Sequence, residues 1–125
     1  MLCGVILTFI ITLTLTNITK EYVGRIRPNN VAEISAMIRV LQEPKTYSFF
    51  SGHASSSFSI VTFLVLAIRS FNPWVYLAYI WPLIFVASRI YVGVHYPSDI
   101  LVGAMVGTII AFFGYSISKY FVKNV

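Results

Sequence analysis

The chain has 125 residues, of which 58% are hydrophobic and only 10% are charged, and its formal net charge is +5. Because soluble domains carry roughly 25% charged residues, this composition excludes an ordinary soluble domain. The apolar residues gather in runs, and the mean hydropathy is +0.81, which indicates one integral membrane domain. A nucleic-acid partner is not expected, because no soluble segment contains a basic helix or a basic groove with interleaved aromatic residues.

The first apolar run, residues 1–19, is free of charged side chains and about long enough to cross a bilayer, which takes roughly 20 residues. A signal peptide is the competing interpretation. However, no basic segment opens the run, and no small-residue cleavage site precedes Lys20. We therefore expect a membrane-spanning helix, with which the chain opens directly.

Residues 20–52 form a polar segment that Pro28 and Pro44 interrupt. Within it, apolar residues repeat with helical spacing over residues 31–41, which predicts a short helix lying at the membrane interface. Arg25 is expected only to extend its charged head toward water, as isolated basic residues near helix ends commonly do.

Three further apolar runs, residues 53–69, 74–88 and 98–120, are expected to cross the membrane as helices. Pro82 lies inside the second of these runs and predicts a kink. Gly103 and Gly107 have the spacing of closely packed membrane helices. Residues 1–125 are thus predicted to form a single all-α bundle of four spans, with residues 20–52 as its main polar loop.

Four spans place residues 20–50 and 89–99 on the same side of the membrane. The second of these segments contains His95 and Asp99, with Pro97 and Asp99 typical of a helix start. A carboxylate that binds one imidazole nitrogen leaves the other nitrogen free as a base, ligand or nucleophile. The alternative is a polar interfacial loop whose side chains are merely solvated.

The same side of the membrane also carries the start of the second predicted span, Ser51-Gly52-His53, and several basic residues. A helix start offers unpaired backbone N–H groups to an anion. Three fixed charges complete a site suited to a phosphate group: Lys20, Arg27 and Arg89. One histidine would attack phosphorus, and the other would protonate the departing oxygen. A metal site is disfavoured, because the adjacent cations would repel a divalent ion.

Taken together, these elements resemble the type 2 phosphatidic acid phosphatase superfamily. The resemblance consists of a Lys-x6-Arg-Pro element, a Pro-Ser-Gly-His element and a Ser-Arg-x5-His-x3-Asp element in that order. Here they are Lys20 to Pro28, Phe50 to His53 and Ser88 to Asp99. The resemblance implies a membrane helix bundle, usually of six spans. It also implies a bacterial cytoplasmic membrane, with the site on the side that faces the periplasm or exterior. Four spans would make this chain a fragment or a minimal version.

The resemblance also implies roles for individual residues. His95 would be the nucleophile that forms a phosphohistidine, Asp99 would orient it, and His53 would be the general acid and then the base. No metal or other cofactor is implied. The phosphoryl oxygens would be held by Lys20, Arg27, Ser51, the backbone N–H of Gly52, and Arg89.

The implied function is metal-independent hydrolysis of a lipid phosphomonoester or pyrophosphate, with the lipid bilayer and the lipid substrate as partners. Phosphatidate, phosphatidylglycerol phosphate, polyprenyl pyrophosphate and lipid A phosphate remain open, as does the oligomeric state. Phe50 stands where the family usually has proline, and we expect the following turn to form regardless. A truncated, inactive relative that only binds anionic headgroups is an alternative. Vanadium haloperoxidases share the three elements, but they are soluble and much larger.

Overall fold

The structure is a computed structural model, and it describes residues 1–38, 40–41 and 44–123. Its main elements are four α-helices and a 3-10 helix, and the described residues contain no strand. The helices are α1 (Leu2–Val23), α3 (Gly52–Ile68), α4 (Ile80–Tyr91) and α5 (Pro97–Lys123), with the 3-10 helix η2 (Pro73–Tyr79) leading into α4. The predicted all-α transmembrane bundle is confirmed.

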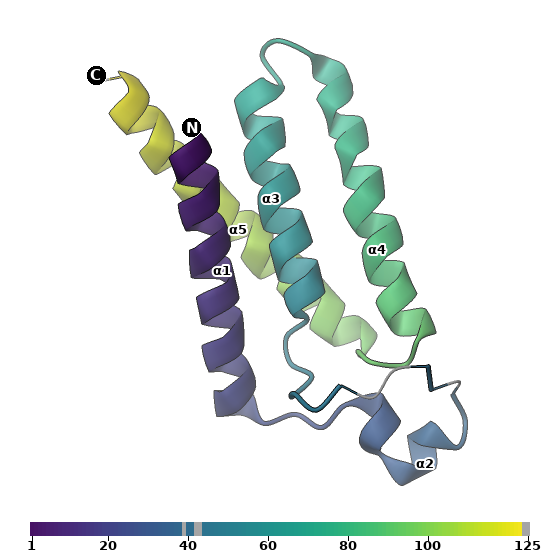
Figure 1. The fold of residues 1–125 in the computed structure, drawn as a ribbon. Helices are drawn as coiled ribbons and strands as arrows, with labels where there is room; N and C mark the ends of the chain where they lie inside the picture. Colours follow the sequence, from purple (N-terminus) through teal and green to yellow (C-terminus); the bar gives the residue numbers. More distant parts are fainter. Residues whose placement is uncertain (39, 42–43, 124–125) are drawn as a thin grey trace.

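Three segments of the described chain are long and apolar enough to cross a membrane, and they contain α1, η2 with α4, and α5. Helix α3 is shorter, with 17 residues. It lies between α1 and α4, and α5 crosses behind it (Figure 1). The most extensive contacts join α3 to α5, and α1 packs against both. The two termini lie at one end of the bundle, opposite the loops that follow α1 and α4 (Figure 1).

Small residues allow α5 to approach α3 closely. A Cβ added at Gly103 would lie 2.6 Å from the backbone oxygen of Ser51, and one added at Gly107 would lie 2.1 Å from that of Ser55. Both distances are below van der Waals contact, so only glycine fits at these two positions. Helix α1 contributes buried threonines to the same interface, and Thr16 forms a 2.9 Å hydrogen bond with Ser55.

Helix α1 is longer than the predicted span and carries Lys20 in its last turn. It ends at Gly24, whose φ of 61° is left-handed and whose N–H donates to the Lys20 carbonyl at 2.9 Å. Glycine adopts this conformation without strain, which explains the helix end at this residue.

The predicted interfacial helix over residues 31–41 is much shorter in the structure. After a 3-10 turn, η1 (Pro28–Asn30), the helix α2 spans only Ala32–Ser35. Its extensive contacts are with η1 rather than with the bundle. A helix this short has little intrinsic stability and is not extended by packing, so the apolar spacing does not produce a continuous face. Arg39, which falls within the predicted helix, lies outside the described residues.

The structure places Pro82, at which a kink was predicted, in the first turn of α4, just after a change of helix type. Pro82 is the third residue of α4, where the missing N–H removes no intrahelical hydrogen bond, and the turns before it are the 3-10 helix η2.

Candidate active site

The loop after α1 and the loop between α4 and α5 meet beside the first turns of α3 and α5 (Figure 1). The backbone N–H of Ser51 donates to the Asp99 carbonyl at 3.0 Å, which joins the two helix starts. Ser51 also caps α3, because its side-chain oxygen accepts from the Ala54 N–H at 3.3 Å. The expected Ser-Gly-His helix start therefore forms with Phe50 in place of proline. Phe50 itself is buried, at 3% exposed.

His95 is buried in the loop before α5, with a different partner near each ring nitrogen. Its Nε2 lies 3.2 Å from Nη1 of Arg27, and its Nδ1 lies 3.6 Å from Oδ2 of Asp99. A guanidinium can only donate, so Nε2 carries the lone pair and Nδ1 carries the proton of the neutral ring. This tautomer directs the basic nitrogen toward the cationic side of the site.

Burial lowers the pKa of His95 below its ordinary value of 6.5. The nearby Asp99 carboxylate opposes this shift in pKa, and the positive charge of Arg27 adds to it. His95 is therefore neutral, and able to act as a nucleophile, to a lower pH than a solvated histidine.

Asp99 is fully buried and is held by donors from both loops. Its Oδ2 accepts hydrogen bonds from the Ser48 hydroxyl and, at 3.1 Å, from the Tyr96 backbone N–H. Its Oδ1 lies 2.7 Å from Nη1 of Arg25. Sequence reasoning missed Ser48, because a single serine in an irregular loop gives no signal.

The prediction that Arg25 only reaches toward water is wrong. Besides its ion pair with Asp99, its Nη1 donates to the Ser98 hydroxyl at 3.0 Å, and its guanidinium lies 4.2 Å from the centroid of the Tyr96 ring. The side chain is 38% exposed, so the ion pair lies at the edge of the buried cluster. Its position in the same basic segment as Arg27 was the available signal.

Arg27 is 4% exposed and is held by backbone as well as side-chain acceptors. Its Nε donates to the Thr46 carbonyl at 2.7 Å, its Nη2 to the Thr46 hydroxyl at 2.9 Å, and its Nη1 to the Val94 carbonyl at 2.9 Å. These bonds fix a cation beside His95, and Thr46 is a second loop residue that sequence reasoning missed.

His53 lies in the first turn of α3, with its ring centroid 6.4 Å from that of His95. Its ring also contacts Phe85 of α4, at 5.5 Å between centroids. Arg89, in the last turn of α4, places its Cζ 5.3 Å from the centre of the same Phe85 ring. The predicted histidine pair and the third cation are thus brought to one place.

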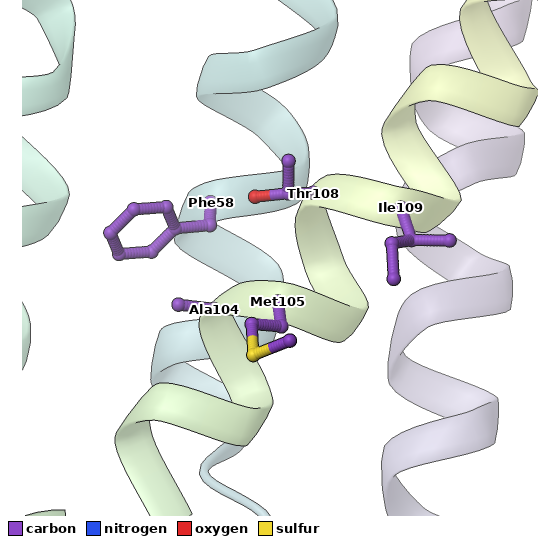
Figure 2. Close-up of a pocket in the computed structure, with 5 residues that line it drawn as sticks. All are labelled: Phe58, Ala104, Met105, Thr108 and Ile109. Atoms are coloured by element: carbon purple, nitrogen blue, oxygen red, sulfur yellow. The ribbon is translucent and has the colours of Figure 1, made fainter.

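A cavity of about 220 Å³ opens beside His53 and is lined by Leu13, Lys20, Gly52, His53 and Ser56. A Cβ added at Gly52 would lie 3.9 Å from Nζ of Lys20, so the lysine reaches the N-terminal turn of α3. A larger apolar groove of about 300 Å³ lies on α3 and α5; Figure 2 shows the residues that line it, Phe58 on α3 and Ala104, Met105, Thr108 and Ile109 on α5. That groove contains no titratable side chain and none of the predicted site residues.

The fold and the site define an integral membrane helix bundle with a buried carboxylate–histidine–arginine cluster at one end. The PAP2 superfamily model matches residues 1–123, and the chain belongs to this superfamily, as its three sequence elements predicted.

Known relatives include an undecaprenyl-diphosphatase from Sulfolobus acidocaldarius, 29% identical over 91% of this chain and 53% of the relative. A lipid A 4'-phosphatase from Porphyromonas gingivalis is 30% identical over 81% of this chain and 43% of the relative. The crystal structure of a transmembrane PAP2 type phosphatidylglycerolphosphate phosphatase from Bacillus subtilis is similar in fold. Its TM-score is 0.72 at 22% identity, over 93% of this chain and 58% of that one. The chain therefore spans about half the length of these relatives.

Proposed function

We propose that this protein is a membrane-embedded lipid phosphatase that works through a phosphohistidine intermediate without a metal ion. The observation that carries the proposal is the pair of neighbouring imidazoles, His53 and His95, which meet edge to face, with Arg27 in contact with one of them. A nucleophile and a proton donor that lie next to each other, with cations nearby, suit phosphoryl transfer.

In the first step, a phosphoryl oxygen takes the hydrogen bond that Arg27 Nη1 gives to His95 in the structure. The freed Nε2 lone pair of His95 then forms a bond to phosphorus, and the bond between phosphorus and the leaving oxygen breaks. His53 gives its proton to that oxygen, so the lipid alcohol or phosphate departs without developing a full negative charge. Asp99 stabilises the positive charge that His95 gains, because its carboxylate faces Nδ1. The departing product carries the transferred proton, and the phosphoryl group remains on His95.

In the second step, a water oxygen attacks the phosphohistidine while His53 takes one proton from that water. The bond between phosphorus and Nε2 breaks, and its electron pair returns to the imidazole. Inorganic phosphate leaves and His53 is again protonated, so the cycle needs no cofactor. Lys20, Arg27 and Arg89 would hold the phosphoryl oxygens in both steps, together with Ser51 and the Gly52 N–H at the start of α3.

The proposed substrate is a lipid phosphomonoester or pyrophosphate of the phosphatidate, phosphatidylglycerol phosphate or polyprenyl type. The names of the relatives support this class, since they act on undecaprenyl diphosphate and on lipid A. The proposed location is a bacterial cytoplasmic membrane with the site at its outer face.

The test is release of inorganic phosphate from these lipids in detergent micelles, with and without excess chelator. We expect turnover that chelator does not reduce, with loss of about 10²-fold or more in His95→Gln and His53→Gln. Lys20→Gln should lose activity, whereas Lys119→Gln, which removes a lysine near the opposite end of the bundle, should not. Lipid binding without turnover would instead support the headgroup-binding alternative.

A trapping experiment separates the two histidines. With p-nitrophenyl phosphate, whose leaving group needs little protonation, His53→Gln should form a phosphoenzyme that is labile in acid and stable in base. His95→Gln should form none. A phosphoenzyme in His95→Gln would contradict the assignment of the nucleophile.

A further inference from the structure

The Phe85 ring of α4 contacts two of the predicted site residues, which belong to different sequence elements. The imidazole of His53 meets it edge to face, with an interplanar angle of 70°, and the guanidinium of Arg89 lies over it. Trp81 stacks on Phe85 with an interplanar angle of 7° and ring centroids 5.7 Å apart. Phe85 is thus placed between the general-acid candidate and one of the phosphate-binding candidates.

His53 depends on such contacts for its orientation. It is exposed at the start of α3, and the contacts found for its imidazole within the described residues are with two rings, Phe85 and His95. Stacked and edge-to-face aromatic pairs have preferred geometries, so a neighbouring ring restricts the directions in which an imidazole can point.

Arg89 is linked to Phe85 in a second way. Its Nε donates to the Ser88 hydroxyl at 3.2 Å, and that hydroxyl donates to the Phe85 carbonyl at 2.6 Å. The last turn of α4 therefore places the guanidinium over the Phe85 ring through both hydrogen bonds and a cation–π contact.

We propose that Phe85 is a positioning residue for phosphoryl transfer, which holds His53 in line with the leaving oxygen and seats Arg89 beside the phosphate. The inference rests on the proposed phosphatase function and adds to it a residue outside the three sequence elements. Helix α4 packs against α3, so this ring also connects α4 to the site.

The consequence depends on the leaving group. An alkyl phosphate ester needs a proton on its departing oxygen, whereas a p-nitrophenyl ester needs little. Loss of His53 orientation should lower kcat/KM for the alkyl substrate only. Any effect through Arg89 should apply to both substrates and cancel in the ratio of their kcat/KM values.

The experiment measures that ratio for dioctanoyl phosphatidate and p-nitrophenyl phosphate. In Phe85→Leu, which keeps apolar bulk and removes the ring, we expect the ratio to fall about tenfold. Phe85→Tyr should restore it. Phe113→Leu, the same substitution at an exposed site on α5, should leave it unchanged. If Phe85→Leu does not purify as a monodisperse protein, Phe85→Met provides a second variant without a ring.

A double mutant tests whether the effect passes through His53. Adding Phe85→Leu to His53→Gln should not lower the ratio further. An unchanged ratio in the single variant, or a further fall in the double variant, would overturn the inference while leaving the phosphatase function intact. Absence of turnover in the wild-type protein, or full activity of His95→Gln, would refute the proposed function itself.

Discussion

Replacement of Arg25 by glutamine tests the most unexpected contact of the site. Arg25 approaches Asp99 at 2.7 Å, but its side chain is 38% exposed, so solvent screens the pair. Hydrogen bonds to charged groups contribute about 1.5–3 kcal/mol when they are shielded, and screening reduces this to about 1–2 kcal/mol. Asp99 keeps Ser48 and the Tyr96 N–H as donors in the variant. The carboxylate should therefore stay in place but orient His95 less well.

A loss of 1–2 kcal/mol corresponds to a fall of about 5- to 30-fold in rate. We expect this fall in kcat with KM nearly unchanged, because Arg25 contacts Asp99 and Ser98 and does not line the cavity beside Lys20. Arg25→Lys retains the charge and should recover part of the loss. The assay is steady-state phosphate release. A large rise in KM at constant kcat would refute the reasoning, since it would make Arg25 a substrate ligand.

Three further predictions concern the site and the packing beneath it. Ser48→Ala removes a buried donor to Asp99 and should lower kcat about tenfold, measured with Ser70→Ala as the control. Burial lowers the pKa of His95, so the acid limb of the pH profile of kcat/KM should lie below pH 6.5. Activity is present above that limb and is lost as the pH falls through the lowered pKa. Once the ionisation of the substrate is subtracted, a limb above pH 6.5 would contradict this assignment. Gly107→Ala places a Cβ against the Ser55 carbonyl and should lower thermal stability in detergent, by about 1–3 kcal/mol in the free energy of unfolding. The control for Gly107→Ala is Ala104→Ser. Gly24→Ala is less suitable as a control, because Gly24 has a positive φ.

The sequence predicted the general architecture because the physical signals for membrane helices are strong and local. Runs of apolar residues located the helices, and the spacing of Gly103 and Gly107 predicted the close approach of α5. The same logic failed where tertiary context decides the local structure. The helix predicted over residues 31–41 is reduced to α2, and the change of helix type just before Pro82 was not predicted.

The residues of the candidate site around His95 show a similar division. Arg27 and Asp99 were both predicted as site residues, Asp99 as the partner of His95 and Arg27 as a phosphate ligand, because they stand at fixed spacings in recognisable elements. Ser48 and Thr46 come from an irregular loop whose path is set by tertiary hydrogen bonds, such as that between the Ser48 N–H and the Arg25 carbonyl at 2.8 Å. A loop of this kind has no periodicity that a sequence pattern could reveal.

The contact between α3 and α5 explains how two parts of the candidate site, one at the start of each helix, are held together. The Ser51 N–H bonds to the Asp99 carbonyl, and Gly103, one turn further along α5, lies against the Ser51 backbone. The turn proposed to bind phosphate and the carboxylate that faces His95 are therefore parts of one helix–helix interface. Since this interface is the most extensive in the bundle, a substitution that separates α3 from α5 should disturb both parts of the site together. One that affects only the outer face of α1 should disturb neither.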